Sequence, residues 1–210
     1  SLESFFEQLD ASQKQRIEVV GIDRAGAYQS AVTQHLPDAA IVYDRFHLVM
    51  NVNQAVDEVR RSEWRAADKP EKKLIKHSRY LLLKNPEKLS ESAAERLRDL
   101  RDANENISTA YQLREQFRVI YLYQREGWAR RALISWCELA EASGLKSFKR
   151  LAKGFRKHSD RITSYIKYRL TSGRIEGFNS KLARVITRAC GIANLDYLYL
   201  KMRHQSVMQI

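Results

Sequence analysis

Two aspartates in this sequence stand where a carboxylate could bind a metal ion. Asp23 directly follows the apolar run at residues 17–22, and Asp44 directly follows a second run at residues 39–43. Ligands of open α/β sheets bind beyond the carboxyl ends of the strands, and Mg²⁺ prefers carboxylate oxygens. Either aspartate could equally cap the helix that follows it. Position alone therefore leaves both metal binding and capping open.

A histidine follows the second aspartate within one helical turn, in the string Asp44-Arg45-Phe46-His47. His47 could orient a carboxylate or meet DNA. A single histidine beside an apolar stretch is more often a packing residue, so this string by itself is a weak signal.

Glu176 lies near the start of a late amphipathic helix. The apolar stripe of this helix consists of Ile175, Phe178, Leu182, Val185 and Ile186. A separate basic stripe consists of Arg174, Lys181, Arg184 and Arg188. Glu176 belongs to neither stripe, and an acidic residue in a first turn gains only ~0.3–1 kcal/mol from the helix dipole. Gly173 and Gly177 weaken the helix start by roughly 1 kcal/mol per interior glycine, which suggests that something approaches the backbone closely there.

Only the start of the chain has an α/β pattern. Apolar spacing predicts a helix at residues 1–13, a strand at 17–22, a helix at 27–36 and a strand at 39–43, with a right-handed crossover in a parallel sheet. Two strands do not make a stable sheet by themselves, and no later segment has a strand pattern. We therefore expect the partner strands to precede Ser1.

The remainder of the chain has helical periodicity. The stretches expected to form helices are residues 52–66, 70–84, 90–103, 106–126, 128–142, 146–157, 159–170, 174–189 and 194–208. Gly191 is expected in the turn between the last two of them. We expect a mostly α chain, with an α/β part at residues 1–50, a helical domain at 51–171 and C-terminal helices at 172–210.

The charge balance points to a polyanionic partner. The chain has 37 Lys and Arg against 25 Asp and Glu, a formal net charge of +12. Nucleic acid is the favoured partner, because no single basic helix has the pattern of a surface membrane anchor. No apolar run reaches the ~20 residues that span a bilayer. Cys137 and Cys190 lack zinc-site spacing, so we expect a reduced, cytoplasmic protein.

These strings together resemble the ISL3 family of bacterial insertion-sequence transposases. The likeness extends over nearly the whole chain and is strongest around Asp44-Arg45-Phe46-His47 and around Glu176-Gly177-Phe178-Asn179. Either string alone would be weak, but both in this order and context are specific.

The resemblance implies a ribonuclease-H-like catalytic fold with an Asp-Asp-Glu triad. Asp23 resembles the second triad aspartate by strand order, although Asp44 competes for this assignment, and Glu176 resembles the triad glutamate. The first aspartate has no counterpart in this sequence, so we expect it upstream of Ser1. The implied fold is an α/β remnant of a ribonuclease-H-like core with a helical insertion domain.

The implied activity is DNA cleavage and strand transfer with two Mg²⁺ or Mn²⁺ ions, acting on transposon ends and target DNA in the bacterial nucleoid. This chain alone is then expected to be inactive, and self-association stays open. Residues expected to orient the site are Arg45, His47 and Asn179, and those expected to contact DNA are Arg60, Arg61, Arg65, Arg174, Lys181, Arg184 and Arg188. The alternatives are a non-catalytic DNA-binding regulator derived from a transposase and a nuclease of the same fold.

Overall fold

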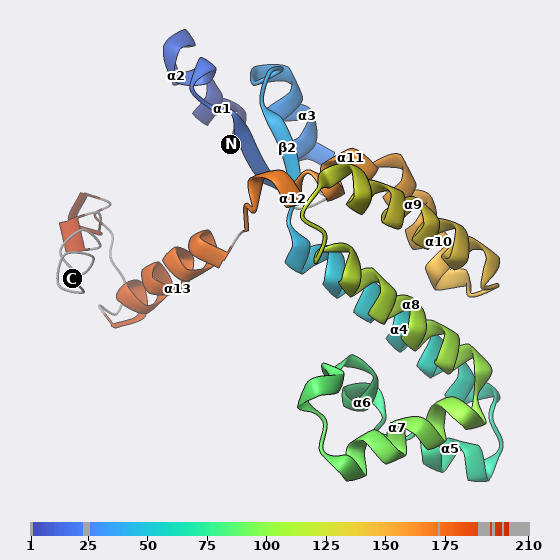
Figure 1. Cartoon of the computed structure of the whole chain (residues 1–210). Helices are drawn as coiled ribbons and strands as arrows, with labels where there is room; N and C mark the ends of the chain where they lie inside the picture. Colours follow the sequence, from blue (N-terminus) through green and yellow to red (C-terminus); the bar gives the residue numbers. More distant parts are fainter. Residues whose placement is uncertain are drawn as a thin grey trace. The chain divides into compact units, whose positions relative to one another are not determined.

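The structure is a computed structural model that describes residues 2–22, 26–171, 173–188, 194, 196–198 and 200–201. It is predominantly helical with one small sheet of two strands among the described residues (Figure 1). The chain divides into two compact units, Ser1–Leu170 and Thr171–Ile210. No helix in the described part is both long enough and apolar enough to cross a membrane.

The sheet of the first unit is parallel, as the sequence predicts. Strand β1 (Val19–Ile22) pairs with β2 (Ala40–Tyr43), and the register runs from Val19 opposite Ala40 to Ile22 opposite Tyr43. Helix α3 (Gly26–His35) lies between the strands in sequence, where a crossover helix was expected. The two strands therefore end at the same edge of the sheet.

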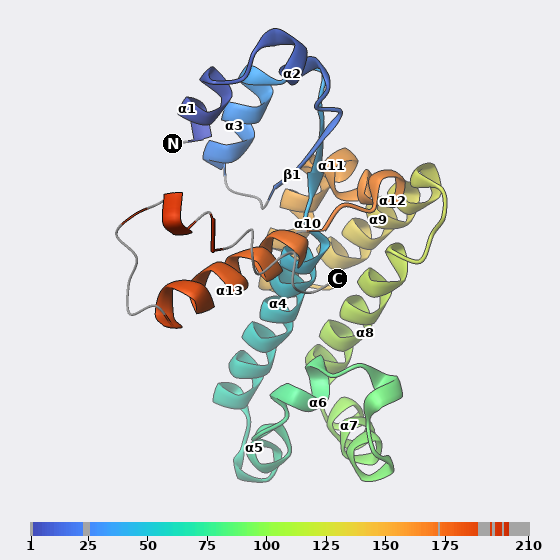
Figure 2. The same ribbon diagram turned by 90° about the vertical axis from the view of Figure 1, so that its left-hand side faces the viewer.

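Helices cover both sides of these strands. A small core of Phe6, Ala31, Val32 and Leu36 joins α1 (Leu2–Glu7) to α3, and Val20 packs against it. Helices α11 (Ser159–Thr163) and α12 (Tyr165–Tyr168) contact β2 from the other side (Figure 2). The expected helix at residues 1–13 is interrupted, because Asp10 caps a separate helix, α2 (Ala11–Gln15), through a capping box.

Helix α4 (Arg45–Ala66) begins directly after β2 and is the central helix of the first unit. Its 22 residues extend about 33 Å at 1.5 Å per residue. Its buried residues are Leu48, Val52, Ala55, Val56 and Val59, and their spacing of three and four places them on one face. This face packs against α8 (Glu105–Ile120) and α10 (Lys146–Lys157). The helix starts before the expected residue 52 because Asp44 caps it.

Short helices follow α4 in the chain: α5 (Lys69–Ile75), α6 (Arg79–Leu83), the 3-10 turn η1 (Pro86–Lys88) and α7 (Glu91–Ala103). The expected helix at residues 70–84 is broken at His77, which has a left-handed φ of 61°. Arg114, which is 3% exposed, fixes this region. Its Nε donates to Asn53 Oδ1 of α4 at 2.9 Å, and its other nitrogens contact Glu115 and the carbonyl of Leu83.

Helices α9 (Glu126–Ala142) and α10 pack closely against each other and contribute to an aromatic core. The Trp136 ring lies 5.1 Å from Phe117 and 5.6 Å from Phe155, measured between ring centroids. The indole nitrogen of Trp136 donates to the carbonyl of Leu113 at 2.7 Å. After α10, the expected helix at residues 159–170 is divided into α11 and α12, and Arg169 ends α12 with a φ of 51°.

The second unit contains α13 (Gly173–Arg188), close to the expected helix at 174–189. Val185 of its apolar stripe is 4% exposed, whereas Phe178 is 53% exposed. In the expected final helix, residues 196–198, 200 and 201 are helical, and Gly191 lies outside the described residues.

Candidate active site and nucleic-acid interface

Asp44 is fixed at the carboxyl edge of the sheet. Its backbone N–H donates to the carbonyl of Ile22 at 3.0 Å, which continues the pairing of β1 and β2 by one residue. Its side chain is only 5% exposed. One carboxylate oxygen accepts the backbone N–H of Phe46 at 3.0 Å, and the other lies 3.2 Å from Nδ1 of His47. Asp44 therefore caps α4, and His47 contacts a carboxylate as the sequence suggested it could.

Asp23 follows Ile22 in the sequence and lies outside the described residues. Ile22 is the last residue of β1 and stands opposite Tyr43, the last residue of β2. The metal-binding prediction for Asp23 therefore stays a prediction, although the described strand ends at the residue before it.

Tyr121, at the end of α8, is a neighbour of this edge that the sequence did not indicate. Its ring is 2% exposed, and its hydroxyl has no hydrogen-bond partner among the described residues. The guanidinium carbon of Arg45 lies 5.0 Å from the ring centroid. Burial raises the pKa of Tyr121 strongly, and Arg45 opposes this effect, whereas the charges of Tyr165 and Asp44 add to it. Nothing in the spacing of the sequence links residue 121 to residue 44.

Glu176 and Asn179, two further predicted site residues, lie in the second unit. Glu176 is in the first turn of α13, and Glu176, Gly177 and Asn179 are exposed. Among the described residues, no atom comes within 4 Å of a Cβ built on Gly177, so the backbone there is open to approach. The described part of the chain contains no group of three His, Cys, Asp or Glu side chains that could hold a metal ion.

The arginines expected to contact DNA on α4 are partly engaged by an acidic neighbour. Arg60 Nη2 lies 2.8 Å from Asp57 Oδ1, and Arg61 Nε lies 3.3 Å from Asp57 Oδ2. Arg65 is exposed at the end of the same helix. Arg60 is separated from Asp44 by about 24 Å of helix at 1.5 Å per residue, so it belongs to a different part of the surface.

Three of the four residues of α13 that are expected to contact DNA have described side chains. Lys181, Arg184 and Arg188 are exposed, and Arg184 donates to the carbonyl of Ser180 at 3.2 Å. The side chain of Arg174 lies outside the described residues.

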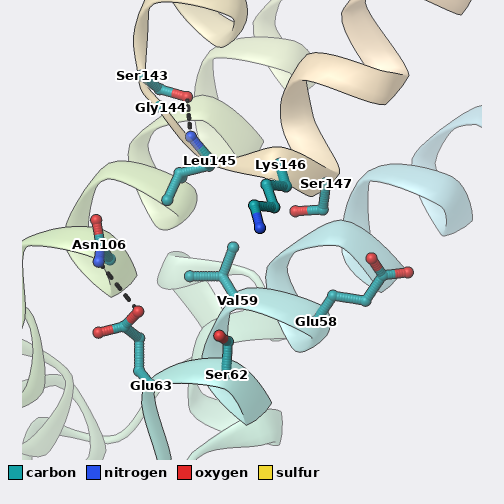
Figure 3. A pocket seen from close by; sticks show the side chains of 10 residues that line it. All are labelled: Glu58, Val59, Ser62, Glu63, Asn106, Ser143, Gly144, Leu145, Lys146 and Ser147. Carbon is teal, nitrogen blue, oxygen red and sulfur yellow. Dashed lines mark hydrogen bonds between the residues drawn. The ribbon is translucent and has the colours of Figure 1, made fainter. Parts of the chain in front are cut away.

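A hollow of about 450 Å³ opens between α4, the start of α8 and the turn that joins α9 to α10 (Figure 3). Its walls carry Glu58, Glu63 and Lys146, and Asn106 donates to Glu63 at 3.0 Å. Glu58 lies about 21 Å along α4 from Asp44 at 1.5 Å per residue. The hollow is therefore separate from the sheet edge, and its mixed charges favour no single class of ligand.

The chain thus combines a small parallel sheet, which ends at the buried Asp44, with a predominantly helical and basic remainder. A sequence profile described as "Transposase", that of the DDE transposases of the ISL3 type, matches residues 1–202. The chain therefore belongs to the ISL3 family of transposases.

Individual relatives have the same description. The chain is 36% identical over 203 residues to the transposase for insertion sequence element IS1001 of Bordetella parapertussis. The matched region covers 95% of the chain and 50% of that protein. It is 29% identical over 207 residues to the transposase for insertion sequence element IS1557 of Mycobacterium tuberculosis, covering 88% of the chain and 46% of that protein. The chain thus spans about half the length of these relatives. No solved structure matches it significantly.

Proposed function

We propose that this chain forms part of the catalytic region of a transposase that cleaves DNA and joins the released 3′ end to a target. In this proposal β1, α3 and β2 belong to a ribonuclease-H-like core, and α4 to α10 form a helical domain inserted into it. The observation that carries the proposal is the parallel register of β1 and β2, which ends both strands at one edge, directly before Asp23 and Asp44. Family membership supports the same activity.

Glu176 and one of the two aspartates at the sheet edge, Asp23 or Asp44, are the proposed carboxylates for Mg²⁺ or Mn²⁺. Their oxygen atoms are the ligands that these hard cations prefer. A pair of such ions, when bound, would activate the attacking hydroxyl or water and stabilise the leaving oxygen. The proposal takes Glu176 from α13 and at least one aspartate from the sheet edge, together with a further aspartate from the remainder of the full-length protein.

Between the two aspartates, we assign the ligand role to Asp23 and a positioning role to Asp44. Asp44 already accepts from the Phe46 amide and contacts His47, and it is almost fully buried. A carboxylate has about four lone-pair sites, and the contacts of Asp44 with the Phe46 amide and with His47 already direct both of its oxygens towards the start of α4.

The test is an assay of the full-length protein on plasmid DNA that carries the ends of its own element, with Mg²⁺ present. We expect D23N and E176Q to abolish cleavage and strand transfer while DNA binding and thermal stability remain at wild-type levels. D44N should keep cleavage, because asparagine also caps a helix. Cleavage by D23N or by E176Q at the wild-type rate would overturn the catalytic proposal.

Two further results would redistribute the roles. Loss of cleavage in D44N with normal stability and DNA binding would make Asp44 a ligand. A wild-type protein that binds DNA but never cuts it would favour a regulatory function instead. The 210-residue chain alone should give no strand transfer under the same conditions.

A further inference from the structure

Helix α10 is a twelve-residue helix without an acidic residue. Its basic residues are Lys146, Lys149, Arg150, Lys153, Arg156 and Lys157. So high a density of one charge on one helix raises the local potential and attracts a polyanion.

The opposite face of α10 is already used by the core. Phe148, Ala152 and Phe155 are each 0% exposed. A basic amphipathic helix binds a membrane surface by burying its apolar face among the lipids. That face is not available here, so the basic side of α10 fits a partner that offers charge without requiring apolar insertion.

The arginines of α10 have acidic partners on the neighbouring helices. Arg150 Nη2 lies 2.8 Å from Glu58 Oε2 of α4, and Arg156 Nη2 lies 2.8 Å from Glu141 Oε2 of α9. These ion pairs link the two sides of the exposed face of α10 to α4 and to α9. The positive charges of Arg150 and Arg156 are therefore partly compensated within the chain.

Lys149, Lys153 and Lys157 lie on the exposed face between these flanks, and we call them the α10 lysine row. All three are exposed, and none forms an ion pair with any residue in the described part of the chain. They recur every four residues, so they follow one line with steps of about 6 Å and a total length of about 12 Å. One DNA strand carries a phosphate every ~3.4 Å of helix axis, so a row of this length extends along about three to four phosphates.

We propose that the α10 lysine row binds the phosphate backbone of duplex DNA without reading its sequence. Lysine ammonium groups are flexible point charges rather than planar forks, which suits contact with phosphates in general more than recognition of one base. This proposal rests on the proposed function, and it goes beyond it by assigning DNA contact in the first unit to the α10 lysine row, whose three charges form no ion pair among the described residues.

The test compares two triple glutamine variants of the 210-residue chain. K149Q/K153Q/K157Q removes the row. K73Q/K84Q/K88Q removes the same charge from exposed lysines on α5, after α6 and in η1, and serves as the matched control. Binding to a fluorescent duplex of arbitrary sequence is measured by anisotropy across a salt series, and thermal unfolding confirms that both variants fold.

We expect the row variant to bind about tenfold or more weakly at ~0.1 M salt, because three phosphate contacts are lost. The slope of log Kobs against log salt should fall by roughly 2–3, since each phosphate contact contributes about 0.9. The control should keep both the affinity and the slope of the wild type. K149R/K153R/K157R should also keep them, because the charges remain.

The outcomes separate this proposal from the proposed function. A wild-type chain that binds no DNA contradicts the assignment of DNA as partner and sinks both. If the wild type binds DNA and the two glutamine variants bind as tightly as it does, or are weakened equally, only the proposal for the lysine row is overturned. Loss of binding to phosphatidylserine vesicles in the row variant, with DNA binding unchanged, would replace DNA by a membrane surface and also overturn it.

Discussion

The Nδ1 atom of His47 lies 3.2 Å from the Oδ2 atom of Asp44, within the first turn of α4. This contact holds the carboxylate that also caps the helix, and it connects the end of β2 to the central helix of the first unit. The edge of the sheet where chemistry is proposed is thus joined to the first turn of α4 by the side chain of Asp44. Removing both acceptor oxygens of Asp44 should therefore lower the stability of the fold.

Replacing Asp44 separates its capping role from its charge. D44A removes the acceptor of the Phe46 amide and should lower the free energy of unfolding by about 1 kcal/mol, within the usual range of about 0.5–2 for an N-cap. D44N keeps an oxygen at the cap and should stay close to wild type. Urea unfolding with an unchanged m-value measures both. Equal losses in D44A and D44N would show that the charge, and not the cap, stabilises α4.

Two glycines of the α9–α10 hairpin should respond in opposite directions to alanine. Gly144 has a φ of 77°, which costs a residue with a Cβ about 1–2 kcal/mol, so G144A should destabilise. Gly127 lies in the first turn of α9, and among the described residues no atom lies within 4 Å of a Cβ added there. G127A should therefore stabilise by up to about 1 kcal/mol. Thermal unfolding of the two variants gives the signs, and a stabilising G144A would contradict the left-handed turn.

Two buried tyrosines offer a matched test of their hydroxyls. The Tyr121 hydroxyl has no partner among the described residues, so Y121F should be neutral or slightly stabilising. The Tyr43 hydroxyl donates to Gln29 Oε1 at 2.8 Å and accepts from Arg161 at 3.4 Å. Y43F should therefore cost about 1 kcal/mol. If Y121F costs as much as Y43F in denaturant unfolding, Tyr121 has a partner in solution.

Cys137 should make the fold less stable in alkali. It is 0% exposed, and burial raises the pKa of its thiol from 9.0 to about 11. Well below pH 9 the thiol is protonated in both states. As pH rises from there towards 11, the unfolded chain releases the proton first, so unfolding becomes easier by up to ~1.4 kcal/mol per pH unit.

The measurement for Cys137 is the difference in unfolding free energy between wild type and C137A from pH 8 to pH 11. Taking this difference cancels the titration of lysines and tyrosines common to both chains. We expect the wild type to lose stability more steeply than C137A. Parallel curves would show that the thiol ionises equally easily in both states.

Short sequence patterns predicted the elements whose apolar spacing is regular. The parallel pair β1 and β2 was predicted from two short apolar runs with a helix between them, and α10 begins and ends at the expected residues. Helix breaks were harder to predict. The residues around His77 and Arg169 keep helical periodicity, but both residues adopt a positive φ, and the chain turns there so that Ile75, Leu82 and Ile166 can all be buried.

The sequence by itself determined the family, the charge, the helical character and the pair of strands that end before Asp23 and Asp44, because these depend on residue types and short spacings. Tertiary structure decided which groups meet. Tyr121 and Arg114 are brought to partners far away in the sequence, and Arg150 and Arg156 are paired while the α10 lysine row is not. Such pairings depend on how whole helices pack around a shared core, and no local spacing records that arrangement.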